Sequence, residues 1–281
     1  YVAGASGGNL VLLRSVNGGT SFSDVTGAVA GHNTSGARLG VTVANTSYVY
    51  CVNIGSTSPP IVIKSTDKGA TWAVTATSTT TGLTGSSATT GLGMSNGQGY
   101  YDLGIVVSPA NANHVIVGTT TSYKSTDGGV NFTPLGGYAG PLGIHPDMQC
   151  AVAQGSDCYI TTDGGVNYSS DFFTNAANWS IRNNGLRSSD FWGFGQGWDE
   201  DMVVGGRYHN GNTAIFEAFG GGKALSLGGG EDATGHVYHG HSRTVGFRDI
   251  GNLNIPVSLT GTVQYSAQNV PNSMWPQDDY Y

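Results

Sequence analysis

The sequence predicts an all-β fold assembled from repeated antiparallel hairpins, and three observations support that prediction. A phrase of the form Ser/Thr-x-Asp/Asn-x-Gly that closes on an aromatic residue occurs four times, and pairs of short apolar runs recur along the chain. No stretch shows the apolar stripe of an amphipathic helix. Only 10 % of the residues are charged and 46 are glycine, a balance typical of many short strands joined by turns.

Each residue of the repeated phrase has a physical role in a turn between two strands. The hydroxyl and the carboxylate can accept N–H groups of the turn, while glycine adopts the positive φ that other residues resist. The closing aromatic residue can fill the apolar layer beside the hairpin, which contributes roughly 1.5–3 kcal/mol if it is fully buried. We assign these roles to Ser15, Asn17, Gly19 and Phe22; to Ser65, Asp67, Gly69 and Trp72; to Ser125, Asp127, Gly129 and Phe132; and to Thr161, Asp163, Gly165 and Tyr168.

The repeated phrase resembles the Asp-box, also called the bacterial neuraminidase repeat. The resemblance implies a β-propeller, the fold of sialidases, xyloglucanases and sortilin-type receptor domains. In those families the box lies on a hairpin at the rim of the blade, away from the axial ligand site. The resemblance therefore bears on the fold more than on the function.

The apolar runs have the strand-loop-strand spacing expected of the inner half of a propeller blade, with the box hairpin as the outer half. They occur at residues 39–53, 103–118, 143–154, 191–206 and 224–240. Counting on this basis gives about six four-stranded blades (five to seven), near residues 1–30, 36–76, 100–135, 139–181, 187–222 and 224–265. We expect residues 1–281 to form a single β-propeller domain, with residues 77–99 as an insertion loop.

Landmarks between residues 100 and 250 resemble large secreted Asp-box propellers of the sortilin-like and xyloglucanase-like kind. They include Tyr100-Tyr101-Asp102-Leu103, His145-Pro146-Asp147-Met148-Gln149 and Gly228-Gly229-Gly230-Glu231-Asp232. Such proteins are common in Bacteroidota, where many are exported by the type IX route. The resemblance implies a secreted or cell-surface location and a chain that is a piece of a longer exported protein.

Charge and composition argue against several kinds of partner. The formal net charge is −7 and the 11 lysine and arginine residues are spread thinly, so we expect neither nucleic-acid binding nor a basic face for anionic lipid. No apolar run is long enough to cross a bilayer, so we expect no membrane insertion. The glycine-rich phrases at 220–222 and 228–230 lack the Gly-Lys-Ser/Thr of a phosphate loop, and we expect no cofactor.

The innermost strands of a propeller and the loops that leave them converge on its axis, so residues distant in sequence can meet there. Two carboxylates across a cleft can serve as acid and base on a glycosidic bond. The alternative is that polar groups at the axis tie strands and turns together, as buried polar groups usually do. The candidate catalytic acids are Asp102, Asp147, Glu231 and Asp232, and the candidate ligand-binding residues are Tyr101, His145, Trp192, Arg207 and His209.

The sequence leaves three functions open. The first is a noncatalytic extracellular module that binds or scaffolds a polysaccharide or a protein at the cell surface, together with other domains of its parent protein. The second is a glycoside hydrolase of xyloglucanase-like or sialidase-like type with an axial carboxylate pair. Only seven arginines and no Arg-Ile-Pro sequence are present, which argues against a true sialidase. The third is a structural subunit of a larger cell-surface assembly.

Cysteine and histidine spacing bears on disulfides and metals. Cys150 and Cys158 are spaced for two antiparallel strands joined by a short turn, so a cross-strand disulfide is one interpretation and two reduced, packed thiols are the other. Cys51 has no evident partner. The cluster of His236, His239 and His241 lacks an established zinc spacing, and the box aspartates lack the alternating oxygen ligands of a calcium loop, so we expect no metal site.

Overall fold

The computed structural model describes residues 1–55, 60–77, 99–186, 191–197, 201–207, 211–216, 225–228, 235–237, 244–249 and 251–256. Their regular structure consists of β-strands and two single-turn 3₁₀ helices, η1 (Gly27–Val29) and η2 (Ala176–Asn178), which confirms the predicted all-β class. The chain divides into two compact units, residues 1–184 and 185–281, and the single domain expected over residues 1–281 stays a prediction. No helix among the described residues is long and apolar enough to span a membrane.

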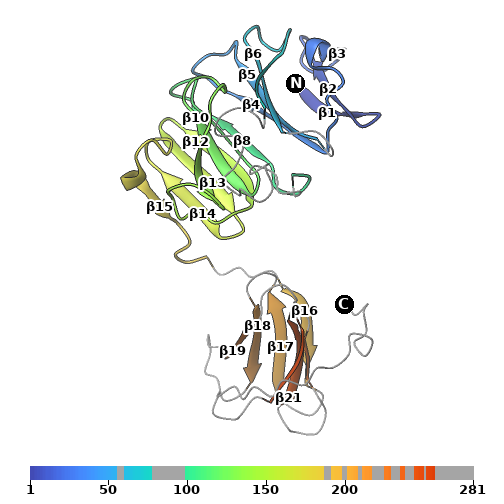
Figure 1. Cartoon of the computed structure of the whole chain (residues 1–281), viewed down its shortest axis with the longest axis vertical. Helices are drawn as coiled ribbons and strands as arrows, with labels where there is room; N and C mark the ends of the chain where they lie inside the picture. Colours follow the sequence, from blue (N-terminus) through green and yellow to red (C-terminus); the bar gives the residue numbers. More distant parts are fainter. Residues whose placement is uncertain are drawn as a thin grey trace. The chain divides into compact units, whose positions relative to one another are not determined.

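Within its described residues, the first unit contains four antiparallel sheets that follow one another along the chain (Figure 1). Sheet 1 consists of β1 (Val2–Ser6), β2 (Asn9–Arg14) and β3 (Ser23–Asp24). Sheet 2 consists of β4 (Gly36–Val41), β5 (Val49–Ile54), β6 (Ile61–Ser65) and β7 (Ala73–Thr77). Sheet 3 consists of β8 (Gly104–Val107), β9 (Val115–Gly118), β10 (Thr121–Ser125) and β11 (Thr133–Gly137). Sheet 4 consists of β12 (Met148–Gln154), β13 (Asp157–Thr162), β14 (Gly165–Ser169) and β15 (Trp179–Ile181).

The second unit contains two further antiparallel sheets within its described residues. Sheet 5 consists of β16 (Phe191–Gln196), β17 (Met202–Arg207), β18 (Gly211–Phe216) and β19 (Leu225–Gly228). Sheet 6 consists of β20 (Gly235–Val237), β21 (Thr244–Asp249) and β22 (Gly251–Pro256). The prediction placed residues 224–240 together in the last blade, but β19 pairs with β18 and so belongs to sheet 5.

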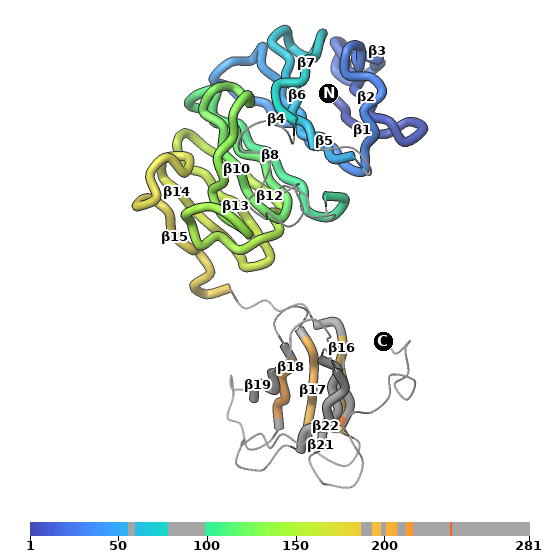
Figure 2. Tube along the Cα trace, viewed as in Figure 1, coloured from blue at the N-terminus to red at the C-terminus, as the bar shows by residue number. Residues whose placement is uncertain are grey.

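Sheets 2, 3 and 4 have the organisation of propeller blades. Within each sheet the strands pair in chain order, and the first strand of sheet 3, β8, lies beside both β4 and β12. Figure 2 follows these sheets along the chain, from blue through cyan and green to yellow. The limits of sheets 2 and 3, 36–77 and 104–137, lie within four residues of the predicted blades at 36–76 and 100–135. Sheet 4, at 148–181, ends where the blade predicted at 139–181 ends but begins nine residues later. The strand pair predicted at 143–154 is instead a loop followed by the single strand β12.

The core lies between neighbouring sheets. Continuous apolar runs form the middle strands because these strands are covered on both faces, and β5 and β9 are buried at every position. One apolar cluster fills each gap between neighbours. Representative pairs are Leu12 with Ile63 between sheets 1 and 2, Tyr50 with Val117 between sheets 2 and 3, and Ile116 with Met148 between sheets 3 and 4.

Three of the four repeated phrases form the same hydrogen-bonded turn, which we call a Ser–Asx turn. The serine hydroxyl donates to the Asp or Asn side chain two residues on and accepts the N–H of the residue four positions on. In sheet 3, Ser125 Oγ lies 2.8 Å from Asp127 Oδ1 and 2.9 Å from the Gly129 nitrogen. The equivalent distances are 2.7 and 2.8 Å at Ser65, and 2.9 and 2.8 Å at Ser15.

The aromatic residues that close these three turns differ in burial. Trp72 and Phe132 are buried in the core, as predicted. Phe22, which closes the turn of sheet 1, is 45 % exposed. The aromatic position therefore contributes to the core only in the turns of sheets 2 and 3.

The strand–turn–strand predicted at residues 161–168 is present, with Gly165 at a φ of 108°, but it is an earlier hairpin of sheet 4 and not a Ser–Asx turn. Thr161 lies in β13, Gly165 and Tyr168 lie in β14, and Asp163 stands in the two-residue link between these strands. The local sequence is compatible with either hairpin. In sheet 4 this phrase links the second strand to the third, whereas in sheets 2 and 3 the phrase links the third strand to the fourth.

Sheet 4 has its Ser–Asx turn at Ser169 and Asp171, between the third and fourth strands as in sheets 2 and 3. Ser169 Oγ lies 2.8 Å from Asp171 Oδ1 and 2.8 Å from the Phe173 nitrogen. Phe172 and Phe173 take the places of the turn glycines, with φ of 57° and 55°, although bulky residues rarely adopt such angles. Both rings are buried between sheets 3 and 4, and this packing offsets the backbone strain.

The predicted disulfide between Cys150 and Cys158 is wrong, because these residues and Cys51 are free thiols. In the β12–β13 ladder Cys158 lies opposite Ala153 and Cys150 lies opposite Thr161, so the two cysteines are not cross-strand neighbours. Cys158 is buried in the core and Cys150 is exposed. The register of the hairpin therefore separates two thiols that the spacing alone had paired.

Candidate functional site

The innermost strands β4, β8 and β12 carry different chemistry at their two ends. Asp102 lies just before β8 and Asp147 immediately before β12. The residues that close these strands at their other ends, among them Val41 and Val107, are apolar and line a pocket. We call the first group the acid pair and the second the axial pocket. The acid pair contains two of the predicted carboxylates, whereas the axial pocket was not predicted.

The acid pair joins sheet 3 to sheet 4. Asp102 is fully buried and Asp147 is 5 % exposed, and their carboxyl groups are hydrogen-bonded to each other. Gln149 Nε2 donates to Asp102 Oδ1 at 3.4 Å and to Asp163 Oδ1 at 3.0 Å. The structure therefore brings two of the four predicted catalytic acids into contact and places a third carboxylate nearby.

Burial and the neighbouring acids both raise the pKa of Asp102. Burial first, then the charge of Asp147, its hydrogen bond and the charge of Asp163 raise the pKa of Asp102 from 3.8 to about 7. Two carboxylates in contact cannot both ionise at low cost, so the pair holds one shared proton over most of the acidic range. The Asp147 backbone adds strain, since its φ is 70°.

The contact between the two carboxyl groups does not match the geometry used for glycoside hydrolysis. Retaining enzymes hold their carboxyl groups about 5–5.5 Å apart and inverting enzymes about 6.5–9.5 Å apart, with room for sugar or water between them. Asp102 and Asp147 touch, and their exposed fractions are only 0 % and 5 %. In this arrangement the pair ties the start of β8 to the start of β12.

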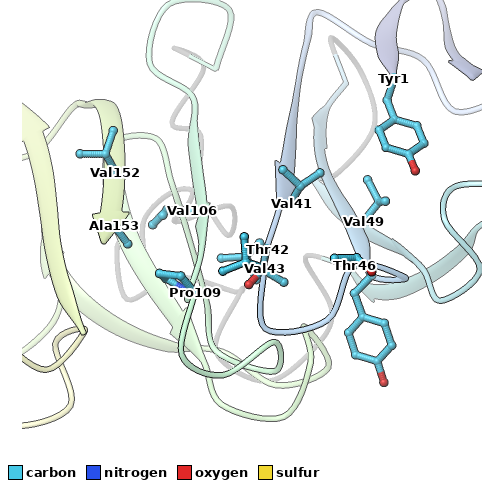
Figure 3. A pocket seen from close by; sticks show the side chains of 12 residues that line it. Tyr1, Val41, Thr42, Val43, Thr46, Val49, Val106, Pro109, Val152 and Ala153 are labelled. Atoms are coloured by element: carbon cyan, nitrogen blue, oxygen red, sulfur yellow. The ribbon is translucent and has the colours of Figure 1, made fainter. Parts of the chain in front are cut away.

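The axial pocket has a volume of about 560 Å³, within the range of about 300–1,000 Å³ typical of ligand sites. Figure 3 shows Val41 between Tyr1 on one side and Val152 with Ala153 on the other. Val43 of the β4–β5 loop completes this wall. The pocket therefore combines side chains from sheets 1 to 4.

The lining of the pocket is apolar and uncharged. Among the described residues, no Asp, Glu, Lys, Arg or His side chain lines it, and Thr46 and Tyr48 are among its few polar side chains. Val41, Val43 and Val152 are 60 %, 78 % and 57 % exposed. Exposed valines that gather around one hollow are unusual in a soluble protein and typically mark an interaction site.

The other predicted ligand-binding residues of the first unit do not line this pocket. Tyr101 is 57 % exposed beside Asp102. His145 is also exposed, and its ring packs against Gly164, with Nδ1 3.0 Å from the Pro146 carbonyl oxygen. Both residues therefore lie near the acid pair rather than near the axial pocket.

The remaining predicted site residues fall in the second unit. Trp192 lies on β16 and Arg207 ends β17, but their side chains are outside the described part of the structure. His209, Glu231 and Asp232 lie outside the described residues. Within the part of the chain that the structure describes, no group of three or more His, Cys, Asp or Glu residues is arranged to hold a metal ion.

The sequence analysis missed the pocket because it searched for polar side chains. The available signal was the valine pair Val41 and Val43 at the end of an apolar run, in a segment expected to turn into a polar loop. An apolar residue at the tip of a loop has no core to fill unless a partner covers it. This signal appears in one short stretch, and the other residues of the pocket come from distant strands.

Comparison with known proteins gives structural similarity only. No protein-family model matches the sequence, and no curated protein matches it. The chain is similar to the GH74 enzyme of Niastella koreensis, with 18 % identity over 89 % of this chain and 41 % of that chain and a TM-score of 0.43. It is also similar to the GH74 xyloglucanase of Xanthomonas campestris, with 13 % identity over 79 % of this chain and 36 % of that chain and a TM-score of 0.36. A third similar structure is the SapL1 lectin in complex with alpha methyl fucoside, with 12 % identity over 94 % of this chain and 90 % of that chain and a TM-score of 0.38.

The chain thus covers less than half the length of these two GH74 enzymes. The similar structures include both glycoside hydrolases and a lectin. The fold class is established by the chain itself: consecutive antiparallel sheets, paired in chain order, with their first strands adjacent. On this topology the protein has an all-β fold of the propeller type.

Proposed function

We propose that this chain is a noncatalytic binding module whose axial pocket receives an uncharged, apolar group of a protein partner. One observation carries the proposal: at one end of the innermost strands the acids are sealed, and at the other end exposed valines surround an open hollow. Covering one valine side chain contributes roughly 1.5–3 kcal/mol. A partner that covers the valines of the pocket would therefore gain binding free energy from apolar burial, whereas the buried acid pair offers a partner no accessible group.

The lining favours a protein partner over a polysaccharide. A sugar ring is bound through several hydrogen-bonding groups and an aromatic side chain on which it stacks. The pocket has few polar side chains, such as Thr46 and Tyr48, and therefore offers few hydrogen bonds to a sugar. We further propose, on the Asp-box resemblance, that the module is secreted or held at the cell surface within a longer exported protein. Export by the type IX route belongs to the same proposal.

Glycoside hydrolysis is the second candidate, because two predicted catalytic acids do meet at the starts of β8 and β12. It requires the pair to separate and admit a substrate. Release of reducing sugar from xyloglucan or a sialyl oligosaccharide by the wild-type chain, abolished in Asp102→Asn and in Asp147→Asn, would favour this function over binding alone.

Our test of the proposed function uses peptides selected on the chain from a random 12-residue library. Val43→Asp places a charge at the pocket on a residue that is 78 % exposed, so folding is preserved. Val16→Asp is the matched control, because Val16 is 80 % exposed on the Ser–Asx turn of sheet 1 and does not line the pocket. We expect Val43→Asp to weaken peptide binding at least ten-fold, about 1.4 kcal/mol, and Val16→Asp to leave it unchanged. Equal affinities for both variants would contradict the proposal.

A further inference from the structure

Two Asn-Gly dipeptides lie entirely within the described residues, Asn17-Gly18 and Asn184-Gly185. Two others begin at Asn96 and Asn210, which lie outside the described residues. Both described asparagines are exposed. Both of their glycines have a positive φ, 70° and 87°, and a Cβ added to either would meet nothing within 4 Å. The two dipeptides therefore match in sequence, in solvent access and in the conformation of the glycine, and the difference between them lies in what holds the asparagine side chain.

The side chain of Asn17 is held by the Ser–Asx turn of sheet 1. Its Oδ1 accepts the Ser15 hydroxyl at 2.9 Å and the Ser21 N–H at 3.0 Å. Its Nδ2 donates to Ser21 Oγ at 2.8 Å. Any rotation of this amide breaks hydrogen bonds at both of its polar atoms, so the turn keeps the amide in one orientation.

The side chain of Asn184 makes no hydrogen bond among the described residues. The residue before it is anchored on sheet 4, because Asn183 Oδ1 accepts the Val166 N–H at 2.8 Å and its Nδ2 donates to the Gly164 carbonyl oxygen at 2.7 Å. Asn184 is thus the first residue beyond this anchor. The boundary between the two compact units falls between Asn184 and Gly185.

An asparagine that precedes glycine can react with its own main chain, one reason why asparagine is a thermolabile residue. The glycine nitrogen attacks the side-chain carbonyl carbon Cγ, the Cγ–Nδ2 bond breaks, and ammonia leaves with the proton of the glycine N–H. Water then opens the cyclic imide. Opening at Cγ gives aspartate, and opening at the main-chain carbonyl carbon gives isoaspartate. Glycine favours the attack because it has no Cβ to shield its nitrogen, and the attack requires the amide to rotate toward that nitrogen.

We propose that Asn184 is a site of spontaneous modification, where the folded chain forms aspartate and isoaspartate, whereas the turn of sheet 1 protects the same dipeptide at Asn17. Water is the only reactant besides the chain itself. Isoaspartate carries the main chain through its side-chain carbon atoms, so it lengthens the link between the two units by one methylene group. Either product adds a negative charge to this link. The proposed function of the axial pocket is not needed for this inference.

The test compares the rates of conversion at the two asparagines in one sample of the full chain, incubated in the folded state at mildly alkaline pH. Peptide mapping by mass spectrometry assigns the products, because cleavage after Arg182 and Arg187 releases residues 183–187, and fragmentation of this peptide separates Asn184 from Asn183. We expect Asn184 to convert at least about ten-fold faster than Asn17, which corresponds to about 1.4 kcal/mol. In concentrated urea both asparagines should convert at similar rates, because the turn no longer holds Asn17.

Two variants test the cause of the difference. Ser15→Ala/Ser21→Ala removes both hydroxyl partners of Asn17, so we expect conversion at Asn17 to rise several-fold and conversion at Asn184 to stay unchanged. Asn184→Gln is the control for the assignment. It should abolish the product in residues 183–187, because glutamine would have to close a larger ring.

Three results would overturn the proposal. Equal rates at Asn17 and Asn184 in the folded chain would show that the turn gives no protection. Conversion at Asn184 that is ten-fold slower in the folded chain than in urea would show that this side chain is held after all. Unchanged conversion at Asn17 in Ser15→Ala/Ser21→Ala would show that the hydrogen bonds of the turn do not control the reaction.

Discussion

Aspartates at two places in the sheets have opposite electrostatics. In the Ser–Asx turn of sheet 2, hydrogen bonds from the Thr71 hydroxyl and N–H, then from Ser65, lower the pKa of Asp67. At the start of β8, burial and the charge of Asp147 raise the pKa of Asp102. The first carboxylate is stabilised as an anion by the donors around it. The second is stabilised as a neutral acid by burial and by the carboxylates beside it.

The difference shows that an aspartate can stabilise these sheets in two ways, as an anion within a turn or as a neutral acid between two sheets. In the Ser–Asx turns the anion organises a local loop, and every donor lies within four residues of Asp67. At the acid pair the shared proton joins Asp102 to Asp147, which lie 45 residues apart on different sheets. The turn is therefore a property of a sequence phrase, and the acid pair is a property of the packed fold.

The largest effect we expect is a pH dependence that distinguishes the two groups. Because the folded pKa of Asp102 is raised, its contribution to stability is complete below about pH 3.8 and is lost as the pH rises toward about 7. The lowered pKa of the turn aspartates has the opposite sign, so their contribution is present above about pH 3.8 and is lost as the pH falls. Stability of the wild-type chain should therefore peak at mildly acidic pH.

Asp102→Asn tests this prediction, because asparagine can donate to Asp147 without needing a proton from solvent. We expect the urea midpoint of the wild-type chain to fall as the pH rises from about 3.8 to about 7 and that of the variant to depend less on pH in this range, since one pKa unit corresponds to about 1.4 kcal/mol. Asp163→Asn is the control and should flatten the curve less, because the charge of Asp163 raises the pKa of Asp102 less than burial and Asp147 do. Parallel curves for wild type and Asp102→Asn would show that the pair shares no proton.

The same contrast explains what the sequence could predict. Three turns and the limits of sheets 2 and 3 were predictable, because hydrogen bonds within eight residues and short apolar runs fix them. The fourth turn was not, since Phe172 and Phe173 break the glycine rule and only the core between sheets 3 and 4 compensates them. Asp102 and Asp147 were predictable as axial candidates from their place before innermost strands. Their contact and burial depend on how two sheets pack, which no local phrase specifies.

An intermediate effect is expected from removing the turn serines. Ser125 is fully buried, and its hydroxyl accepts the Gly129 N–H and donates to Asp127. Ser125→Ala leaves a buried N–H without a partner, so we expect a loss of about 1–3 kcal/mol in the free energy of unfolding. The matched variant Ser15→Ala breaks the equivalent bonds where water can replace them, and it should cost clearly less. Equal losses in urea denaturation would mean that burial of the turn does not matter.

The smallest effect concerns the turn that carries an amide instead of a carboxylate. Asn17 Oδ1 accepts the Ser15 hydroxyl at 2.9 Å and the Ser21 N–H at 3.0 Å, the bonds that a carboxylate makes in sheets 2 and 3. A charged acceptor makes stronger hydrogen bonds, so Asn17→Asp should stabilise the chain by about 0.5 kcal/mol at neutral pH, measured by urea denaturation. Asp67→Asn is the reverse substitution and should destabilise the chain.

The pH dependence of this gain separates charge from shape. The new carboxylate should have a lowered pKa, as Asp67 does, because it would accept the same turn donors. Its stabilisation should then persist at neutral pH and be lost progressively as the pH falls below about 3.8, the ordinary pKa of an aspartate, toward the lowered pKa of the folded state. A gain of the same size at low and neutral pH would attribute the effect to the backbone preference of aspartate in the turn, and the distinction between anionic turns and the neutral acid pair would lose this support.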